Sequence, residues 1–511
     1  MNIFSRLIAF IRQVMNRMIP AQSVEQVEHI ETPLSTEMQN ALELWHNMYT
    51  DKAPWLKNDH VHSAGYPVLI CAEMARQIVT EMKWHISAKA HVEGEEESTN
   101  PRSEYLKEEF AKLMDALQEK LEQGLAAGGM TIRPYPKDGR IFFGWTMDWE
   151  LYPIAFDDVG NLRDVIFQDQ YRDGNTTYTR LERHKVVKGG VEITQRAFKS
   201  GMDDYIGTEI ELKDVPQWSG LAPRAKVANS DGPMFGWFKV ATANNCDTDS
   251  PMGVSVFHKA RKVIEQADYQ YSRLLWEYEG SELAVDVDPL ALKPKKGEDG
   301  KLEMPKLNDR LFRAVDVGED GYRVFSPNIR DASLLTGLNK LEAMIEDLVG
   351  LSRGTLSDAP AEARTATELK ILRQRTYTTV RNNQAALERC LRDVVRVMDV
   401  YASTYNLAPE GEYEVSFEWD DSVLTDTQQE LGERLELLSQ GIMSKAEIRQ
   451  WYTGETRVQA EQAIQTIEQT TMQTNMDSLL MQAQIESQKA AEMAALEAQN
   501  APPAAPKASG E

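Results

Sequence analysis

The sequence predicts an α+β fold built from several modules, and three observations support this prediction. The chain has 511 residues, which is too long for a single domain with one hydrophobic core. Apolar residues recur every three or four positions over several long stretches, which is typical of amphipathic helices. Between residues 130 and 198, short stretches rich in Ile, Val, Phe, Tyr and Thr alternate with turn residues, which is typical of antiparallel strands.

Residues 1–24 predict an amphipathic arm. Their apolar residues have helical spacing, and Arg6, Arg12 and Arg17 have no acidic neighbours. One interpretation is a helix that docks on a partner or lies on a membrane surface. The other is a terminal arm that packs on a neighbouring subunit or frays. Both interpretations stay open.

Residues 35–235 are expected to form one α+β domain. Helical patterns come first, at about 35–50, 66–87 and 103–127, and Gly128 and Gly129 end the third. The strand patterns follow near 130–135, 141–148, 151–157, 163–171, 176–187 and 190–198. Tight turn signals such as Gly189 and Gly190 separate these strands, so the sequence favours an antiparallel meander over βαβ units.

Residues 251–350 predict two helices joined by a small β insert. The first helix is expected at 251–280, with Ser250 as its N-cap and Pro251 at its first position. In residues 281–328, apolar and polar side chains alternate on both sides of the charged turn KPKKGEDGK. This alternation indicates short strands. Helical spacing returns at 329–350.

A loop and a long helix come next. Gly354 and Pro360 break the helical pattern, so residues 351–364 predict a loop. Thr365 and Glu368 then have the spacing of a capping box, in which each side chain satisfies an amide at the helix start. The helix is expected to run to about residue 404.

The remaining sequence predicts a strand and then helices. A strand at 412–419 completes a module at 365–419, and residues 420–497 read as helical, with box-like starts at Thr425 and Ser444. The final residues, 498–511, have the Ala/Pro-rich composition of a disordered tail.

The charge and the cysteine count limit the function. A net charge of −24 argues against a tight clamp on duplex DNA, which needs many Lys and Arg side chains on phosphates, although DNA can still slide past an acidic wall. The 3 Cys are widely spaced, so we expect a reducing cytoplasm as the place of assembly and no disulfide framework.

Motifs for enzymatic chemistry are missing from the sequence. The pair Gly300 and Lys301 lacks the glycine spacing and the hydroxyl residue of a nucleotide phosphate loop. His60 and His62 are separated by one residue, but no further metal donors can be placed beside them. We therefore expect no catalytic residues, no metal site and no cofactor.

Two stretches carry a resemblance to a known family. The segment PMFGWFKVATANNCDTDSPMGVSVF (233–257) resembles the lead into the first stem helix of the portal proteins of long-tailed, double-stranded DNA phages. The segment RTATELKILRQRTYTTVRNNQAALERCLRDVV (364–395) is similar to the long helix that follows the channel loop in that family. The order of modules also agrees over roughly residues 30–480.

The resemblance implies a ring, commonly of twelve subunits, at one vertex of the capsid in the virion. It implies a wing at 25–250 and 365–419, stem helices at 251–280 and 329–350, a clip at 281–328, a channel (tunnel) loop at 351–364 and a crown at 420–497. The implied partners are double-stranded DNA passing through the channel, the large terminase subunit, the head–tail adaptor, and the major capsid and scaffolding proteins. ATP hydrolysis would belong to the terminase, and no membrane is involved in the mature role.

Candidate contact residues follow from this placement. In the loop we expect Arg353, Thr355, Ser357 and Arg364 to face the DNA, and in the clip turn we expect Lys295, Lys296 and Lys301 to meet the terminase or the adaptor. The alternative for Arg353 is a local pair near the end of the 331–350 helix. For Arg364 it is a pair with Asp358 or Glu362.

Two other functions remain open on the sequence alone. A cytoplasmic scaffold or adaptor could use helices 365–404 and 456–497 to bind partners, but its heptad pattern is not sustained. A nuclease could use Asp420 and Asp421 with distant carboxylates to hold a metal ion, although such a pair more often begins a loop and caps the next turn.

Overall fold

The structure is a computed structural model. It describes residues 24–80, 82–89, 100–201, 205–228, 230, 232–287, 295–296, 302–303, 311–314, 322–358, 366–419, 427–453 and 457–499. Outside these ranges lie residues 1–23 of the expected arm, almost all of the expected tail, Lys301, Arg364, Thr365, Asp420, Asp421 and Thr425. The chain divides into two compact units, Met1–Asp420 and Asp421–Glu511.

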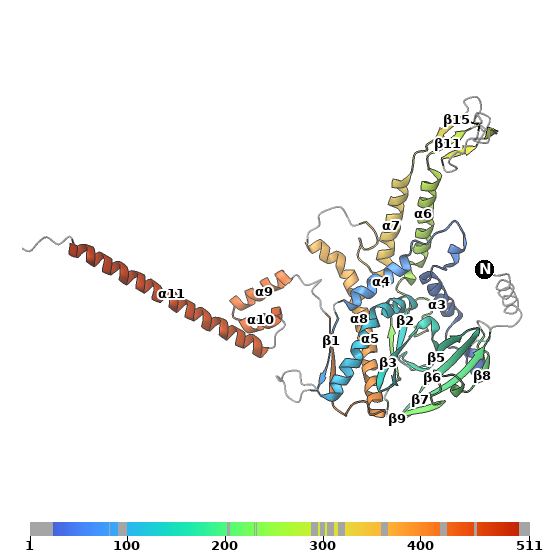
Figure 1. Ribbon diagram of the computed structural model, residues 1–511, viewed down its shortest axis with the longest axis horizontal. Coiled ribbons are helices and arrows are strands. Elements are labelled where there is room, and N and C mark those ends of the chain that lie inside the picture. Colours follow the sequence, from blue (N-terminus) through green and yellow to red (C-terminus); the bar gives the residue numbers. More distant parts are fainter. Residues whose placement is uncertain are drawn as a thin grey trace, which may run out of the picture. The chain divides into compact units, whose positions relative to one another are not determined.

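The first unit combines helices and sheets (Figure 1). Its helices are α2 (Val24–Glu28), α3 (Thr36–Tyr49), α4 (Tyr66–Val79), α5 (Pro101–Ala127), α6 (Arg261–Gly280), α7 (Asp331–Val349) and α8 (Ala366–Thr404). Short 3-10 turns occur at Pro54–Lys57, Asp148–Glu150, Leu212–Asp214 and His258–Ala260. The α+β class is thereby confirmed.

The largest sheet is an antiparallel meander, as expected, but the strands expected near 130–135 and 141–148 lie in a separate sheet. Its strands are β4 (Tyr152–Phe156), β5 (Leu162–Asp173), β6 (Thr176–Val187), β7 (Gly190–Ser200) and β8 (Thr208–Ile210), in that order, with β9 (Arg224–Ala228) also paired to β7. The β6–β7 turn needs glycine, because Gly190 has φ +145° and a Cβ there would lie 2.0 Å from the Val227 carbonyl oxygen.

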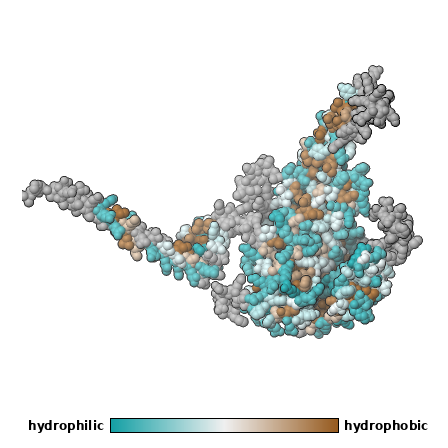
Figure 2. All heavy atoms as spheres, viewed as in Figure 1, coloured by the Kyte–Doolittle hydropathy of each residue, from teal (hydrophilic) through white to brown (hydrophobic). Residues whose placement is uncertain are grey.

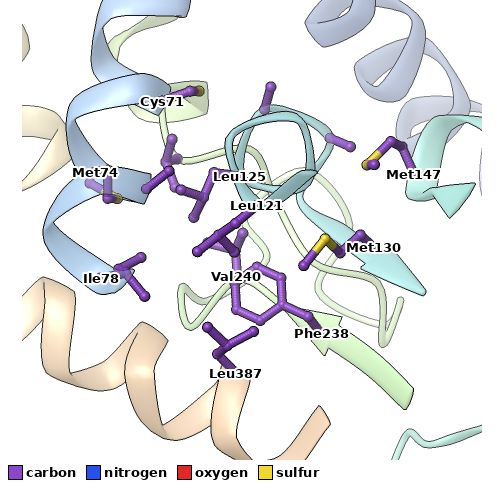
Figure 3. Close-up of a cluster of buried hydrophobic side chains, with 14 of the residues drawn as sticks. Cys71, Met74, Ile78, Leu121, Leu125, Met130, Met147, Phe238, Val240 and Leu387 are labelled. Atoms are coloured by element: carbon purple, nitrogen blue, oxygen red, sulfur yellow. The ribbon is translucent and has the colours of Figure 1, made fainter. Parts of the chain in front are cut away.

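Two smaller sheets pack against the helices of the main core. Strands β10 (Gly236–Lys239), β2 (Gly129–Lys137) and β3 (Arg140–Met147) form one sheet, and β1 (Met82–Ala88) pairs with β16 (Tyr413–Trp419) in the other. Leu121 and Leu125 of α5, Met130 of β2, Phe238 of β10 and Leu387 of α8 are fully buried together (Figure 3). The long helix α8 is thus part of the main core.

The β insert and the second unit complete the described chain. In the insert, β11 (Ala284–Val287) lies between β14 (Phe312–Ala314) and β15 (Tyr322–Phe325), and β12 (Lys295–Lys296) pairs with β13 (Leu302–Glu303). The second unit contains α9 (Thr427–Ser439), α10 (Lys445–Thr453) and α11 (Arg457–Gln499). The capping box expected at Ser444 is confirmed, because Glu447 accepts from its backbone amide at 2.7 Å and Ser444 accepts from the Glu447 amide at 3.3 Å.

The helix expected at 66–87 was too long. Helix α4 ends at Val79, and residues 82–88 form β1, which pairs Met82 with Trp419. The alternation of Met82, Trp84 and Ile86 fits a strand, but the partner strand is far away in the sequence. The segment has both the helical and the strand periodicity, and pairing with a distant strand therefore decides its structure.

The helix expected from Pro251 begins ten residues later, at Arg261, and Ser250 is not its N-cap. The segment before it runs non-helically along the end of α5, where the Val256 amide donates to the Leu125 carbonyl at 3.1 Å. Met252, Val254 and Phe257 are buried there. The close approach requires glycine, since a Cβ on Gly253 would lie 1.9 Å from the Gly128 carbonyl oxygen.

Candidate functional site

Helices α6 and α7 lie side by side and carry the β insert at one end and the expected channel loop after α7 (Figure 1). Carboxylates on these two helices accept hydrogen bonds from the neighbouring segments and hold them in place. Asp268 of α6 is buried and accepts from the Trp55 indole at 2.8 Å and from the Ala64 amide at 2.9 Å. Burial raises the pKa of Asp268, while these two hydrogen bonds oppose that rise.

Glu277, near the end of α6, fixes the start of α7. It accepts from the Arg330 backbone amide at 3.0 Å and from the Arg330 guanidinium at 2.7 Å. The side-chain hydrogen bond with Arg330 lowers the pKa of Glu277. Because Arg330 is the residue before α7, this pair sets where the chain returns from the insert.

The β insert is built around a third carboxylate. Asp286 of β11 is 1% exposed and forms ion pairs with Arg313 at 2.8 Å and Arg323 at 3.1 Å, one on each neighbouring strand. Lys295 and Lys296 form β12, and the structure describes their backbone only. Lys301 lies outside the described residues, so the contact role of these lysines stays a prediction.

The loop after α7 is described up to Asp358, and its candidate residues have partners within the chain. Arg353 donates to Asp347 at 2.7 Å, which is the local pair near the end of the helix that the sequence left as the alternative. Thr355 donates its hydroxyl to the Ser352 carbonyl at 2.6 Å, and the Ser357 hydroxyl donates to Glu346 at 2.7 Å. Arg364 lies outside the described residues.

A groove of about 890 Å³ lies next to this loop, between α4, α5 and α7. Glu73, Glu122 and Glu342 contribute carboxylates to its lining, and Arg76 contributes a guanidinium. The Tyr66 hydroxyl donates to Glu342 at 2.7 Å, and burial raises the pKa of that carboxyl. The groove is therefore polar and mainly acidic beside the loop.

Of the residues considered for metal binding, the structure describes His60 and His62. His60 and His62 donate their backbone amides to Asn58 and Ser272, at 3.1 and 2.8 Å. Within the described ranges, no group of three or more His, Cys, Asp or Glu side chains is placed to hold a metal ion. Among the same residues, no helix has the length and hydropathy needed to cross a membrane.

Sequence reasoning missed the carboxylates that fasten the helices. Glu346 is fully buried between Ile345 and Val349, which lie on the buried face of α7. An acidic residue next to an apolar stripe is the signal that could have identified it, because a carboxylate is rarely buried without several donors.

A buried carboxyl in the first unit gives a testable dependence of stability on pH. Asp148 is fully buried, and its Oδ1 accepts from the Trp237 indole at 3.1 Å. Its Oδ2 has no hydrogen-bond partner among the described residues. Burial raises the pKa of Asp148 from 3.8 to about 7, against the opposing effects of Trp237 and Lys239. The folded state therefore holds this proton at a pH at which the unfolded chain releases it.

We expect wild-type stability to fall by about 2–3 kcal/mol more than that of Asp148→Asn between about pH 5 and pH 8. The folded pKa is raised, so the contribution of Asp148 is full below the unfolded pKa and is lost as the pH rises through the folded one. The asparagine keeps the acceptor for Trp237 and does not titrate. Denaturation followed by tryptophan fluorescence measures the difference, and equal pH slopes in the two proteins would contradict it.

Comparison with known proteins agrees with the resemblance. The family model of the phage portal proteins of the SPP1 Gp6-like type matches residues 70–477. No curated protein matches the chain. That family consists of structural, non-enzymatic components of the phage capsid, which form ring oligomers and take part in DNA packaging. Because the match covers most of the 511 residues, the chain belongs to the SPP1 Gp6-like phage portal protein family.

Proposed function

We propose that about twelve copies of this chain form a ring at one capsid vertex, and that DNA passes through its centre during packaging and ejection. In this arrangement α6 and α7 are the stem, the β insert at 281–328 is the clip and residues 351–364 are the channel loop. Helix α8, β16 and the first α+β region form the wing, and the helices of the second unit form the crown.

The observation that carries this proposal is the apolar surface on two sides of α7. Leu338 and Ile345 are buried, while Leu335 is 44% exposed and Met344 is 51% exposed. At about 100° per residue, Leu335 lies roughly 60° to one side of this buried line, and Met344 lies roughly 120° to the other. Hydrophobic spheres along the helical pair are visible in Figure 2.

Two different apolar sides suit a ring better than a two-fold dimer. A two-fold contact uses the same patch on both subunits, whereas a ring uses two different patches, each covered by the other patch of a neighbour. Leu335 and Met344 supply such a pair of patches on one helix. Trp276 and Tyr278 of α6 and Leu348 of α7 are exposed as well. Several large apolar side chains exposed along one pair of helices indicate contact surfaces.

The charge of the chain suits a passive channel. A net charge of −24 repels phosphates, which limits tight binding and allows DNA to slide. We propose that the channel loop supplies transient basic contacts through Arg353 and Arg364, with Thr355 and Ser357 beside them. Arg353 is 54% exposed in its side chain, so its remaining donors can reach a phosphate while one contacts Asp347.

We further propose that the clip turn, with Lys295, Lys296 and Lys301, meets first the large terminase subunit and then the head–tail adaptor. The turn carries a local positive charge in a chain that is acidic overall, and its partners would present acidic surfaces. The ATP-driven step of packaging then belongs to the terminase.

Mass measurement and negative-stain imaging of the purified chain test the proposal. We expect a ring of about a dozen subunits with a central hole. A stable monomer or a rod-shaped dimer at all concentrations would instead favour a helical scaffold or adaptor.

A further inference from the structure

Glu346 holds the first part of the loop after α7 through four hydrogen bonds. Its Oε1 accepts from the backbone amides of Thr355, Leu356 and Ser357 at 2.8, 2.5 and 2.9 Å. Its Oε2 accepts from the Ser357 hydroxyl at 2.7 Å. One buried carboxylate thereby satisfies consecutive amides of a turn that contains no regular secondary structure.

This arrangement has the physical features of an anchor. Hydrogen bonds to an ionised acceptor are about twice as strong as neutral ones. A buried carboxylate without them would carry a large desolvation cost, so the turn and the side chain stabilise each other. The hydrogen bonds also cross from Glu346 to residues nine to eleven positions later, which fixes the direction of the chain after the helix.

Neighbouring contacts join the same turn to α8. Asp347 accepts from Arg353 at 2.7 Å and from Arg375 of α8 at 2.8 Å. The Ser352 and Thr376 hydroxyls are 2.7 Å apart. The turn is therefore fixed to both helices, and Glu346 is the most deeply buried member of this group of contacts.

We infer that Glu346 is the positioning residue of the channel loop: it holds residues 355–357 on α7, so that the part of the loop beyond Asp358 starts from a fixed point in every subunit. The anchoring itself stands on the geometry above, and its role in the channel rests on the proposed function. A loop with a fixed start in each subunit would present the same residues to the central axis around the ring.

Hydrogen exchange on the assembled full-length protein tests the anchoring. In Glu346→Ala we expect the amides of 355–357 to exchange roughly tenfold faster or more, with exchange in α8 beyond Thr376 unchanged. Glu346→Gln keeps a carbonyl oxygen for the amides but loses the charge, so it should restore part of the protection. The matched control is Glu342→Gln on the same helix, which removes the carboxylate bound by Tyr66 and should leave the turn protected.

The results separate the inference from the proposed function. Unchanged exchange at 355–357 in Glu346→Ala, or equal loss of protection in the Glu342→Gln control, would overturn the anchoring. If Glu346→Ala does not assemble, the same comparison is made with Glu346→Gln. Faster exchange with reduced DNA packaging supports the whole inference. Faster exchange with wild-type packaging keeps the anchoring and shows that the channel does not need it.

Discussion

Leu335→Glu is expected to reduce the purified protein from a ring to a single subunit. Leu335 is exposed on one side of α7, where the proposed ring buries it against the next copy. A glutamate there would bring an unpaired charge into every interface of the ring, and each interface would lose several kcal/mol. Because the interface repeats around the ring, the loss multiplies, and we expect a mass about twelve times smaller in light scattering or native mass spectrometry.

Met344→Glu should have the same effect from the other side of the helix. Mixing the two variants then distinguishes a ring from a two-fold dimer. Leu335→Glu keeps the Met344 side of α7, and Met344→Glu keeps the Leu335 side. One intact interface can therefore form between the two variants, and the altered sides that remain cannot bind a third subunit. We expect the mixture to contain heterodimers, while each variant alone stays monomeric.

Thr336→Glu is the matched control. It adds the same charge to the same helix at an exposed position, where the threonine hydroxyl donates to the Ala332 carbonyl of its own helix. This variant should still form rings. Rings formed by Leu335→Glu would show that this side of α7 is not an interface, and loss of rings in Thr336→Glu would show that added charge alone prevents assembly.

Local pattern was enough to predict most elements of the first unit. The strands of the meander follow from alternating side chains and from turns such as Gly189 and Gly190, since both signals lie within a few residues of each other. Helix α5 follows from its apolar stripe and from Gly128, which adopts the left-handed conformation at its end. These features need no knowledge of distant contacts.

The errors all come from distant contacts. Residues 82–88 become a strand because β16 lies beside them, and residues 251–257 stay non-helical because they pack along α5. The candidate loop was located by Gly354 and Pro360. The position of Glu346 beside an apolar stripe could have marked it as buried, but the sequence does not show that the amides of this loop are its donors. Which segment supplies the donors depends on how α7 packs, which periodicity alone does not determine.

Arg133→Met is expected to destabilise the first unit by about 3 kcal/mol. Arg133 of β2 is 5% exposed and lies over the Phe167 ring, 4.4 Å from its centre. It pairs with Asp169 of β5 at 3.1 Å and with Glu182 of β6 at 3.5 Å, so it joins the small sheet to the meander. Methionine fills much of the volume but leaves these carboxylates with fewer positive neighbours.

The companion substitution Glu182→Gln shows whether the loss of the Arg133–Glu182 ion pair causes the lower stability of Arg133→Met. Burial raises the pKa of Glu182, but Arg133, His184 and Arg180 lower it by more, so the folded pKa lies below the ordinary value. Its stabilising contribution is present above the unfolded pKa and is lost as the pH falls through the folded one. Without Arg133 the folded pKa rises toward the unfolded one, so the loss of stability in acid should become smaller and should end at a higher pH.

The double variant, Arg133→Met with Glu182→Gln, should recover part of the lost stability, because no buried charge then lacks its partner. Arg224→Met is the control: Arg224 pairs with Glu192 at 3.2 Å on the same sheet, but its side chain is 71% exposed. Its loss should cost less than about 1 kcal/mol. Urea denaturation at neutral and acidic pH measures all four proteins against wild type. Additive effects of the two core substitutions would mean that Arg133 acts through its packing on Phe167 and not through the charge of Glu182.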